Sequence, residues 1–211
     1  MSYEHIDSWK NESVFLQQLK LNLYQFRHEW PTHWNHFVSQ VRLLNTKIDQ
    51  IVDIGCGCGA YSLIVQKEFN NIDYIGFDYS SEAIKVSKES FGEIGKFEKK
   101  SYQEINSDDV CKEDLVLING LIDILPEGNK CLEHIIRLNP RAILLQRIAL
   151  TQDKSYHEVY ETPYGIKTYK FYYNKQGLIE TIKKNGYVVF KWDTFDAESV
   201  DILIVNDNTI R

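Results

Sequence analysis

The sequence predicts an α/β fold: a doubly wound, mostly parallel sheet of seven strands with an antiparallel last strand, preceded by an N-terminal helical cap. Three observations support this prediction. Apolar residues recur at helical spacing before residue 46, apolar runs alternate with helical segments from residue 50 onward, and the last two apolar runs are separated by a short turn. We therefore assign residues 1–46 to the cap and residues 47–211 to the α/β domain.

The composition is that of a globular protein, with 211 residues of which 43% are hydrophobic and 26% charged. No apolar run reaches about 18 residues and no charged-then-apolar leader is present, so we expect a cytoplasmic protein without a membrane partner. The formal net charge of -6 argues against nucleic acid as the main partner. The four cysteines lack the paired spacing of a metal knuckle, so we expect reduced thiols and no metal site.

The cap is expected to consist of two helices. Apolar side chains recur at spacings of three and four at Phe15, Leu16, Leu19, Leu23 and Phe26. Pro31 ends the first helix, because the residue before a proline avoids the α region, and a second helix is expected from Thr32 toward Leu44. Ser8 or Ser13 could cap the first helix.

Strands and helices are expected to alternate from residue 50 to the end of the chain. We expect strands near residues 50–54, 73–78, 95–99, 114–118 and 141–148, and helices near residues 59–69, 80–91 and 126–138. The uninterrupted apolar run at 114–118 is typical of a central strand buried on both faces. A long connection is expected from residue 149 to 173, followed by a helix at 174–185. The strands at 187–195 and 200–205 are too close for a crossover helix and should form an antiparallel hairpin.

A glycine-rich turn joins the first expected strand to its helix. The apolar run Ile51 to Ile54 is followed by Gly55, Gly57 and Gly59 at alternate positions. Glycine permits positive φ and lets a ligand approach the main chain where a Cβ atom would block it. The free N–H groups at the start of the next helix point toward the same place. The stretch therefore predicts a binding loop for a nucleotide-type cofactor.

Two cofactors fit this loop. Gly55-x-Gly57-x-x-Ala60 satisfies the loose dinucleotide fingerprint, and Asp78 lies where that fingerprint places the acidic ribose ligand. Asp53 favours a different ligand, because a carboxylate inside the strand is a poor neighbour for a pyrophosphate and a good one for an ammonium or sulfonium group. An NAD(P)-binding oxidoreductase or epimerase remains the principal alternative.

Residues 52–60 resemble the first motif of the class I S-adenosylmethionine-dependent methyltransferases, an acidic residue followed by glycines at alternate positions. The resemblance extends over residues 50–205 and implies a Rossmann-like fold with S-adenosyl-L-methionine as cofactor. It implies that Asp53 faces the amino group of the cofactor. The residues that it places around the methionine part are Gly55, Cys56, Gly57 and Gly59.

The resemblance also implies cofactor contacts at the ends of the next three strands. Asp78 closes the second strand and would accept hydrogen bonds from the ribose hydroxyls, with Tyr79 beside the adenine or the ribose. Where the family often has an acidic residue for the adenine amine, this chain has Ser101 and Tyr102, either of which could supply the contact. Asn119, after the fourth strand, would lie near the reactive end of the cofactor.

Methyl transfer is an in-line displacement at a positively charged sulfur, so positioning the acceptor supplies much of the acceleration. A hydroxyl acceptor also benefits from a base that removes its proton. The Tyr-rich connection after the fifth strand lies at the edge of the sheet where ligands bind in such folds. We predict His157 of this connection as the base, with Tyr156 and Asp123 as further catalytic candidates. Other candidates for the base are Glu127, His33 and His36.

The sequence thus predicts a methyltransferase that acts on a small polar molecule, by O-methylation of a hydroxyl on a sugar or a related metabolite. The segment Tyr169 to Tyr187 also resembles a methyltransferase subgroup associated with bacterial surface polysaccharides, which favours a sugar acceptor. A catalytically silent relative, which binds the cofactor or a partner through its aromatic cap, is a third interpretation. We allow for a homodimer.

Overall fold

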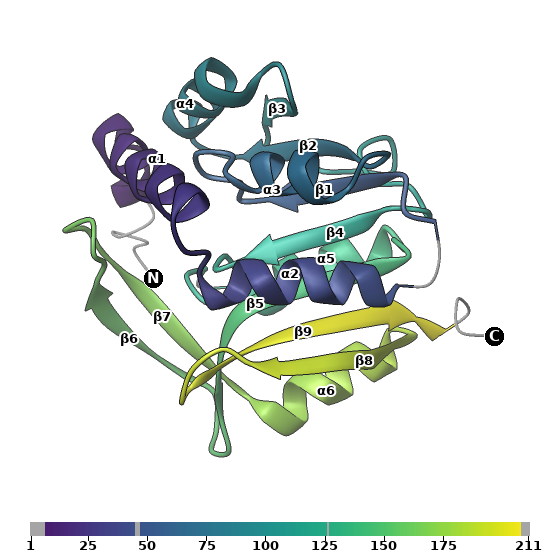
Figure 1. The fold of residues 1–211 in the computed structure, drawn as a ribbon. Helices are drawn as coiled ribbons and strands as arrows, with labels where there is room; N and C mark the ends of the chain where they lie inside the picture. The colour runs from purple at the N-terminus through teal and green to yellow at the C-terminus, as the bar shows by residue number, and fades with distance from the viewer. Residues whose placement is uncertain (1–6, 45–46, 126, 208–211) are drawn as a thin grey trace.

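The computed structural model describes residues 7–44, 47–125 and 127–207. After a short 3₁₀ turn at Asp7–Trp9, the helices are α1 (Glu12–Arg27), α2 (Thr32–Leu43), α3 (Tyr61–Glu68), α4 (Ser81–Phe91), α5 (Gly128–Arg137) and α6 (Lys175–Lys184). The strands are β1 (Gln50–Ile54), β2 (Asp73–Asp78), β3 (Lys96–Lys99), β4 (Leu115–Asn119), β5 (Ala142–Thr151), β6 (Tyr156–Glu161), β7 (Lys167–Asn174), β8 (Tyr187–Thr194) and β9 (Ser199–Asn206). Figure 1 shows the helices on both faces of a twisted sheet.

The main sheet has the strand order β3-β2-β1-β4-β5-β9-β8. The first five of these strands are parallel, β9 runs antiparallel beside β5, and β8 pairs antiparallel with β9. This arrangement confirms the predicted sheet of seven strands with an antiparallel last strand. Because the carboxyl ends of β1, β2, β4 and β5 meet at one edge, the residues that follow these strands become neighbours.

The sheet separates two apolar cores. Leu115 and Leu117 of β4 face the core that contains α2, α3 and α4, whereas Val116 and Ile118 face the core that contains α5 and α6. All four side chains are fully buried. The uninterrupted apolar run of β4 therefore has the cause that the sequence predicts, burial on both faces of a central parallel strand.

The long connection predicted after the fifth strand is in the structure an extension of β5 followed by a β-hairpin. Strand β5 extends to Thr151, and β6 and β7 pair antiparallel from Tyr156↔Tyr172 to Glu161↔Lys167. The turn between them contains Gly165, whose φ of 73° suits glycine. Every residue of β6 is exposed, so this strand lacks the alternation of buried and exposed positions on which strand prediction depends. Figure 1 shows the hairpin projecting from the sheet toward α1.

The helix starts agree with the sequence at two places and differ at a third. Helix α2 begins directly after Pro31, and the side chain of Ser80 caps α4 by accepting a hydrogen bond from the N–H of Ala83 at 3.2 Å. The cap of α1 is Asn11, whose Oδ1 accepts from the N–H of Ser13, so the prediction of a serine cap is wrong. The start of α5 predicted at position 126 lies outside the described residues.

Buried polar contacts attach α2 to the sheet. The amide of Gln146 on β5 donates to the carbonyl of His33 at 2.6 Å and accepts from the hydroxyl of Tyr61 at 2.5 Å. Nδ1 of His36 lies 2.7 Å from Oδ2 of Asp201 on β9. Because Gln146 and Asp201 are fully buried, each lost partner would leave a polar group without compensation. The second helix of the cap therefore shares the core of the α/β domain.

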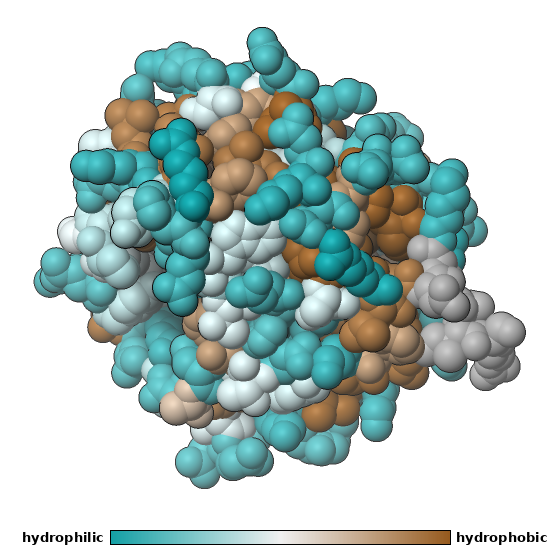
Figure 2. Space-filling model, in the orientation of Figure 1, coloured by the Kyte–Doolittle hydropathy of each residue, from teal (hydrophilic) through white to brown (hydrophobic). Residues whose placement is uncertain are grey.

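Figure 2 shows apolar patches interspersed with hydrophilic residues on this face of the molecule. Among residues 7–44, 47–125 and 127–207, no helix combines the length and apolar character needed to cross a membrane. The same described residues contain no cluster of three or more His, Cys, Asp or Glu side chains suited to a metal ion.

Candidate active site

The glycine loop after β1 has the conformation that its glycines predict. Gly55, Gly57 and Gly59 have φ values of 78°, 54° and 81°, a region that residues with a Cβ atom rarely adopt. The N–H groups of Gly55 and Cys56 donate to the carbonyl of Phe77, at 2.8 Å and 3.0 Å. The loop is therefore held against the end of β2, next to the acidic residue that closes that strand.

Asp78 holds the glycine loop and the start of α4 together. Its Oδ2 accepts from the N–H of Gly57 at 3.0 Å, and its Oδ1 accepts from the N–H of Ser80 at 2.9 Å. Burial raises the pKa of Asp78 to about 6, although the backbone N–H groups of Ser80, Gly57 and Tyr79 favour its charged form. A carboxylate has about four lone-pair sites, so these three donors leave room for a hydroxyl of a ligand.

Asp53 lies inside the sheet rather than in the loop. Its Oδ2 accepts from the hydroxyl of Tyr74 at 2.6 Å, and its side chain is buried. Burial raises the pKa of Asp53 to about 7, the bond from Tyr74 opposes this rise, and the charge of Asp78 adds to it. A direct role of Asp53 toward a ligand stays a prediction, because the residue does not line either of the cavities described next.

A cavity of about 260 Å³ opens at the carboxyl edge of the sheet. The glycine loop and Asp78 form one part of its wall, and the ends of β4 and β5, the two helices of the cap and the hairpin turn form the rest. A second cavity of about 160 Å³ shares Gly55, Asp78 and Tyr79 with the first and extends to Ser101 and Tyr102. The two cavities are therefore neighbours and meet at Asp78.

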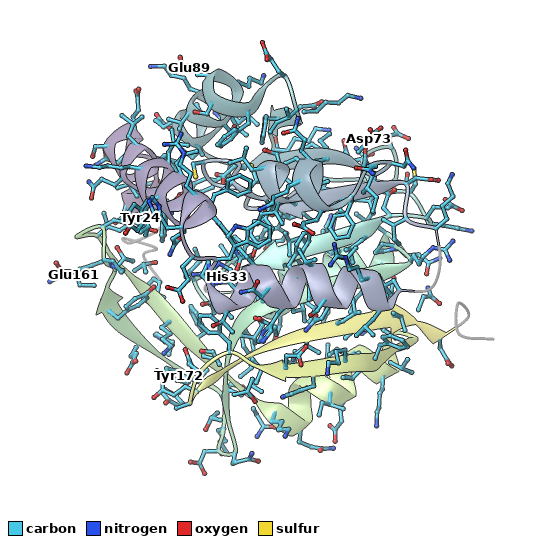
Figure 3. The ribbon with its side chains drawn as sticks, in the orientation of Figure 1. Tyr24, His33, Asp73, Glu89, Glu161 and Tyr172 are labelled. Carbon is cyan, nitrogen blue, oxygen red and sulfur yellow. The ribbon has the colours of Figure 1, made fainter. Side chains whose placement is uncertain are left out.

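The part of the main cavity between β4, β5 and the cap contains a cation and an imidazole. Arg147 on β5 donates from Nε to Oδ1 of Asn119 at 2.9 Å. His33 at the start of α2 and Tyr164 from the hairpin turn line the same cavity. Figure 3 shows His33 near the turn that joins α1 to α2. Residues from four separate segments therefore surround the place where a second reactant would lie.

His33 is neutral in this environment. Burial, together with the nearby positive charges of Arg147 and His36, lowers its pKa to about 3. Its Nδ1 is buried and has no hydrogen-bond partner among the described residues. A neutral imidazole can offer one ring nitrogen as an acceptor, so His33 can accept a hydrogen bond from a ligand hydroxyl.

The residues predicted from the sequence fall into three groups. Those lining the main cavity are Gly55, Cys56, Gly57, Asp78, Tyr79 and Asn119. Ser101 and Tyr102 line the second cavity, whereas Asp53 and Gly59 line neither. Position 59 still needs glycine, because a Cβ atom there would lie 2.6 Å from the ring of Phe97.

The three predicted catalytic residues are not brought together in the cavity. His157 and Tyr156 are exposed on β6, where His157 stacks on Phe171 and Tyr156 on Tyr172. Asp123 is half-buried and lines neither cavity, and its buried Oδ1 has no hydrogen-bond partner among the described residues. Burial raises the pKa of Asp123 to about 6, and the nearby charge of Arg147 opposes the rise.

Several cavity residues were not identified from the sequence. Polar side chains of α1 line the cavity at Gln18, Asn22 and Gln25, and Arg147 lines it from β5. The glutamines and the asparagine lie on a helix that reads as an ordinary amphipathic cap. Arg147 interrupts the apolar run of β5, and that interruption was the one available signal.

The strand order, the glycine loop and the acidic residue closing β2 together define the class of protein that the resemblance implies. A family model described as a methyltransferase domain matches residues 45–192. This match covers more than half of the chain, so the chain belongs to the methyltransferase-domain family. The enzyme class predicted from residues 52–60 is confirmed.

Solved methyltransferase structures share this fold at low sequence identity. Magnesium protoporphyrin IX methyltransferase from Synechocystis PCC 6803, solved with bound SAM, has a TM-score of 0.63 at 15% identity over 91% of this chain and 83% of that one. A S-adenosylmethionine-dependent methyltransferase from Clostridium acetobutylicum ATCC 824 has a TM-score of 0.64 at 10% identity, covering 90% and 98%. The N-terminal domain of EvdMO1, solved in the presence of SAH and D-fucose, has a TM-score of 0.63 at 15% identity, covering 83% and 82%. A search of curated proteins gave no match.

Proposed function

We propose that this chain transfers the methyl group of S-adenosyl-L-methionine to a hydroxyl of a small polar molecule. The proposal rests on the main cavity. One part of this cavity is lined by the glycine loop and Asp78, and the other part, which we call the acceptor compartment, contains His33, Arg147 and Tyr164. Methyl transfer needs the donor and the acceptor in line and in contact, and a cavity with these two parts meets that requirement.

The two cavities suit the parts of this cofactor. The ribose would donate its hydroxyls to Asp78, and the adenine would extend into the second cavity toward Ser101 and Tyr102. The methionine part would lie along Gly55 and Gly57, whose conformation brings the main chain to the cavity surface. Membership of the methyltransferase-domain family supports this cofactor over the dinucleotide alternative.

The lining of the acceptor compartment favours a small hydroxylated molecule. Gln18, Asn22 and Gln25 offer amide donors and acceptors from α1, while Trp34 and Tyr61 bound the space on the α2 side. A few polar groups among aromatic walls are typical of small-molecule sites. The EvdMO1 domain, which shares the fold, was solved in the presence of the sugar D-fucose, and this analogy supports a sugar or a related metabolite.

His33 is the residue that we place against the reacting hydroxyl. It lines the cavity and has an unpartnered buried nitrogen, whereas His157 is exposed on β6. An oxygen that has just gained a methyl group is a strong acid, so an imidazole with a low pKa can still take its proton. Asp123 is the second candidate, because burial brings its pKa to about 6.

Calorimetric titration tests the cofactor. S-adenosylhomocysteine should bind the purified protein with one site, and NAD should not bind detectably. Turnover is then tested with isotopically labelled S-adenosylmethionine and a panel of monosaccharides and their acids, with the product analysed for a new methyl ether. NAD binding in the absence of S-adenosylhomocysteine binding would contradict the proposal, and cofactor binding without turnover on the panel would favour the silent relative.

The protonation of Asp78 predicts a pH dependence of cofactor binding. Burial raises the pKa of this carboxyl to about 6 in the free protein, and ribose hydroxyls that donate to the carboxylate would lower it in the complex. The affinity for S-adenosylhomocysteine should therefore fall as the pH decreases through about 6 and level off above it. Calorimetry between about pH 5 and 8 measures this profile. Asp78→Asn should remove the part of the profile near pH 6 that comes from Asp78, and any part that comes from Asp53, whose pKa burial raises to about 7, should be the same in both proteins.

Replacing His33 with alanine should slow turnover and spare cofactor binding. We expect kcat to fall by about 100-fold, because a positioned acid–base group contributes about 100- to 10000-fold, and the Kd of S-adenosylhomocysteine to change by about 2-fold or less. His157→Ala is the matched control, since it removes the histidine predicted from the sequence. Normal turnover of His33→Ala together with slow turnover of His157→Ala would identify His157 as the base.

A further inference from the structure

The acceptor compartment contains a positive charge that the proposed reaction does not by itself require. Of the described residues that line the main cavity, two carry a charge at neutral pH, Asp78 and Arg147, because His33 has a pKa of about 3. Asp78 lies at the glycine loop and is assigned to the ribose. Arg147 lies at the ends of β4 and β5, where the second reactant would bind.

The backbone holds Arg147 in an unusual conformation that directs its side chain. Its φ is 59°, at an irregularity in the pairing of β5 with β9, and its N–H donates to Oδ1 of Asp201 at 2.7 Å. Positive φ in a residue with a long side chain costs free energy, so the fold must maintain it. The guanidinium packs over Gly120, where a Cβ atom would lie 2.2 Å from Nη2. Contacts of the backbone N–H and of the guanidinium therefore both hold Arg147 in position.

The terminal nitrogens of Arg147 remain available for a ligand. Its Nε donates to Asn119, and no hydrogen bond or ion pair within the described part of the chain uses Nη1 or Nη2. The nearby carboxylate of Asp201 contacts the backbone N–H of Arg147 through Oδ1 and His36 through Oδ2, rather than the terminal nitrogens of Arg147. The charge of Arg147 opposes the rise in the pKa of Asp123, so the two side chains are near each other. They do not form a hydrogen bond, and Oδ1 of Asp123 has no partner among the described residues.

We propose that Arg147 binds a carboxylate on the methyl acceptor. This inference rests on the proposed function and narrows its substrate class to small hydroxy acids, of which sugar acids are one example. Two Nη groups in one plane match the two oxygens of a carboxylate. The sulfonium of the cofactor brings a second positive charge into the same cavity, and an anionic acceptor is attracted by both. Its hydroxyl would then face the methyl group from the side of His33.

The alternative partner for Arg147 is the carboxylate of the cofactor itself. The described contacts of Arg147 are with Asn119, Gly120 and Asp201, at the ends of β4, β5 and β9 rather than in the glycine loop. The amino acid part of the cofactor is expected along that loop, near the N–H groups at the start of α3. This separation favours the acceptor, and the test below includes the cofactor as an outcome.

The test uses the protein saturated with S-adenosylhomocysteine and three small probes followed by NMR titration, namely propionate, its neutral isostere propionamide, and methyl phosphate. Propionate should bind at least about 10-fold more tightly than propionamide. Arg147→Met should remove this difference, and Arg147→Lys should retain part of it. Arg42→Met, which removes a surface cation paired with Glu68, is the matched control and should change nothing.

Three results of these titrations would overturn the assignment of Arg147 to a carboxylate of the acceptor. Equal binding of propionate and propionamide would show that the compartment does not select an anion. Tighter binding of methyl phosphate than of propionate would replace the carboxylate with a phosphate. A loss of about 10-fold or more in affinity for S-adenosylhomocysteine in Arg147→Met would assign the guanidinium to the cofactor. If S-adenosylhomocysteine does not bind the wild-type protein, the proposed function fails, and propionate titration of the ligand-free protein still decides whether Arg147 binds an anion.

Discussion

Replacing Asp78 with asparagine is expected to lower the affinity for S-adenosylhomocysteine by about 10- to 100-fold, because hydrogen bonds to a charged acceptor contribute about 1.5–3 kcal/mol. The variant also places an amide nitrogen where the carboxylate now accepts from the N–H of Gly57 or Ser80. Two donors would then face each other, so either the glycine loop or the start of α4 loses its bond to residue 78, while the bonds of the loop to the carbonyl of Phe77 remain. Isothermal titration calorimetry at a pH above about 7, where Asp78 is ionised, measures the loss.

Asp73→Asn is the control for this change, since it removes an exposed carboxylate from the first position of the same strand. It should leave the affinity unchanged. Circular dichroism should show that both variants are folded. An Asp78→Asn protein that binds S-adenosylhomocysteine as tightly as the wild type would contradict the assignment of Asp78 to the ribose.

Replacing Gly59 with alanine should reduce the free energy of unfolding by about 2–4 kcal/mol, the sum of an unfavourable positive φ and an overpacked core. The φ of Gly59 is 81°, and a Cβ atom would lie 2.6 Å from Cε1 of Phe97 and 3.0 Å from Cβ of Ser87. Phe97 is buried in the core beside α3 and α4 and cannot move away freely. Urea unfolding followed by fluorescence measures the change.

Gly186→Ala separates the effect of backbone strain from the effect of overpacking. The φ of Gly186 is 79°, and a Cβ atom there would meet nothing within 4 Å, so this variant should lose about 1 kcal/mol from backbone strain alone. If Gly59→Ala keeps its stability and loses only the affinity for S-adenosylhomocysteine, the glycine serves approach of the ligand, as the resemblance implies, and not packing.

The parallel part of the sheet could be predicted because its sequence pattern and its burial have the same cause. The apolar run of β4 is buried on both faces, and the three glycines of the loop have the positive φ values that their spacing suggests. The β6–β7 hairpin could not be predicted in this way. It projects from the sheet, β6 is exposed throughout, and its pairing depends on backbone hydrogen bonds that leave little trace in hydropathy.

The residues of the site also differ in whether the sequence could identify them. Asp78 and the glycine loop are close in sequence to the strands that position them, so a local motif identifies them. Arg147, Tyr164 and the polar side chains of α1 reach the cavity through the packing of distant segments. His157 illustrates the same limit, because the Tyr-rich stretch containing it forms a strand whose side chains are exposed. The role predicted for His157 awaits the comparison with His33→Ala.

The walls of the main cavity differ in how firmly they are attached. On the α2 side, the buried amide of Gln146 holds the carbonyl of His33. Where the N-terminal segment meets the hairpin, the indole of Trp9, which lines both cavities, donates to the hydroxyl of Thr168 at 3.3 Å. Breaking this long, partly buried hydrogen bond costs about 1 kcal/mol, whereas breaking the bond of Gln146 would leave a fully buried amide without a partner. We therefore expect the contact between Trp9 and the hairpin to break more often than the contact that holds His33, so that the imidazole keeps its place through each turnover.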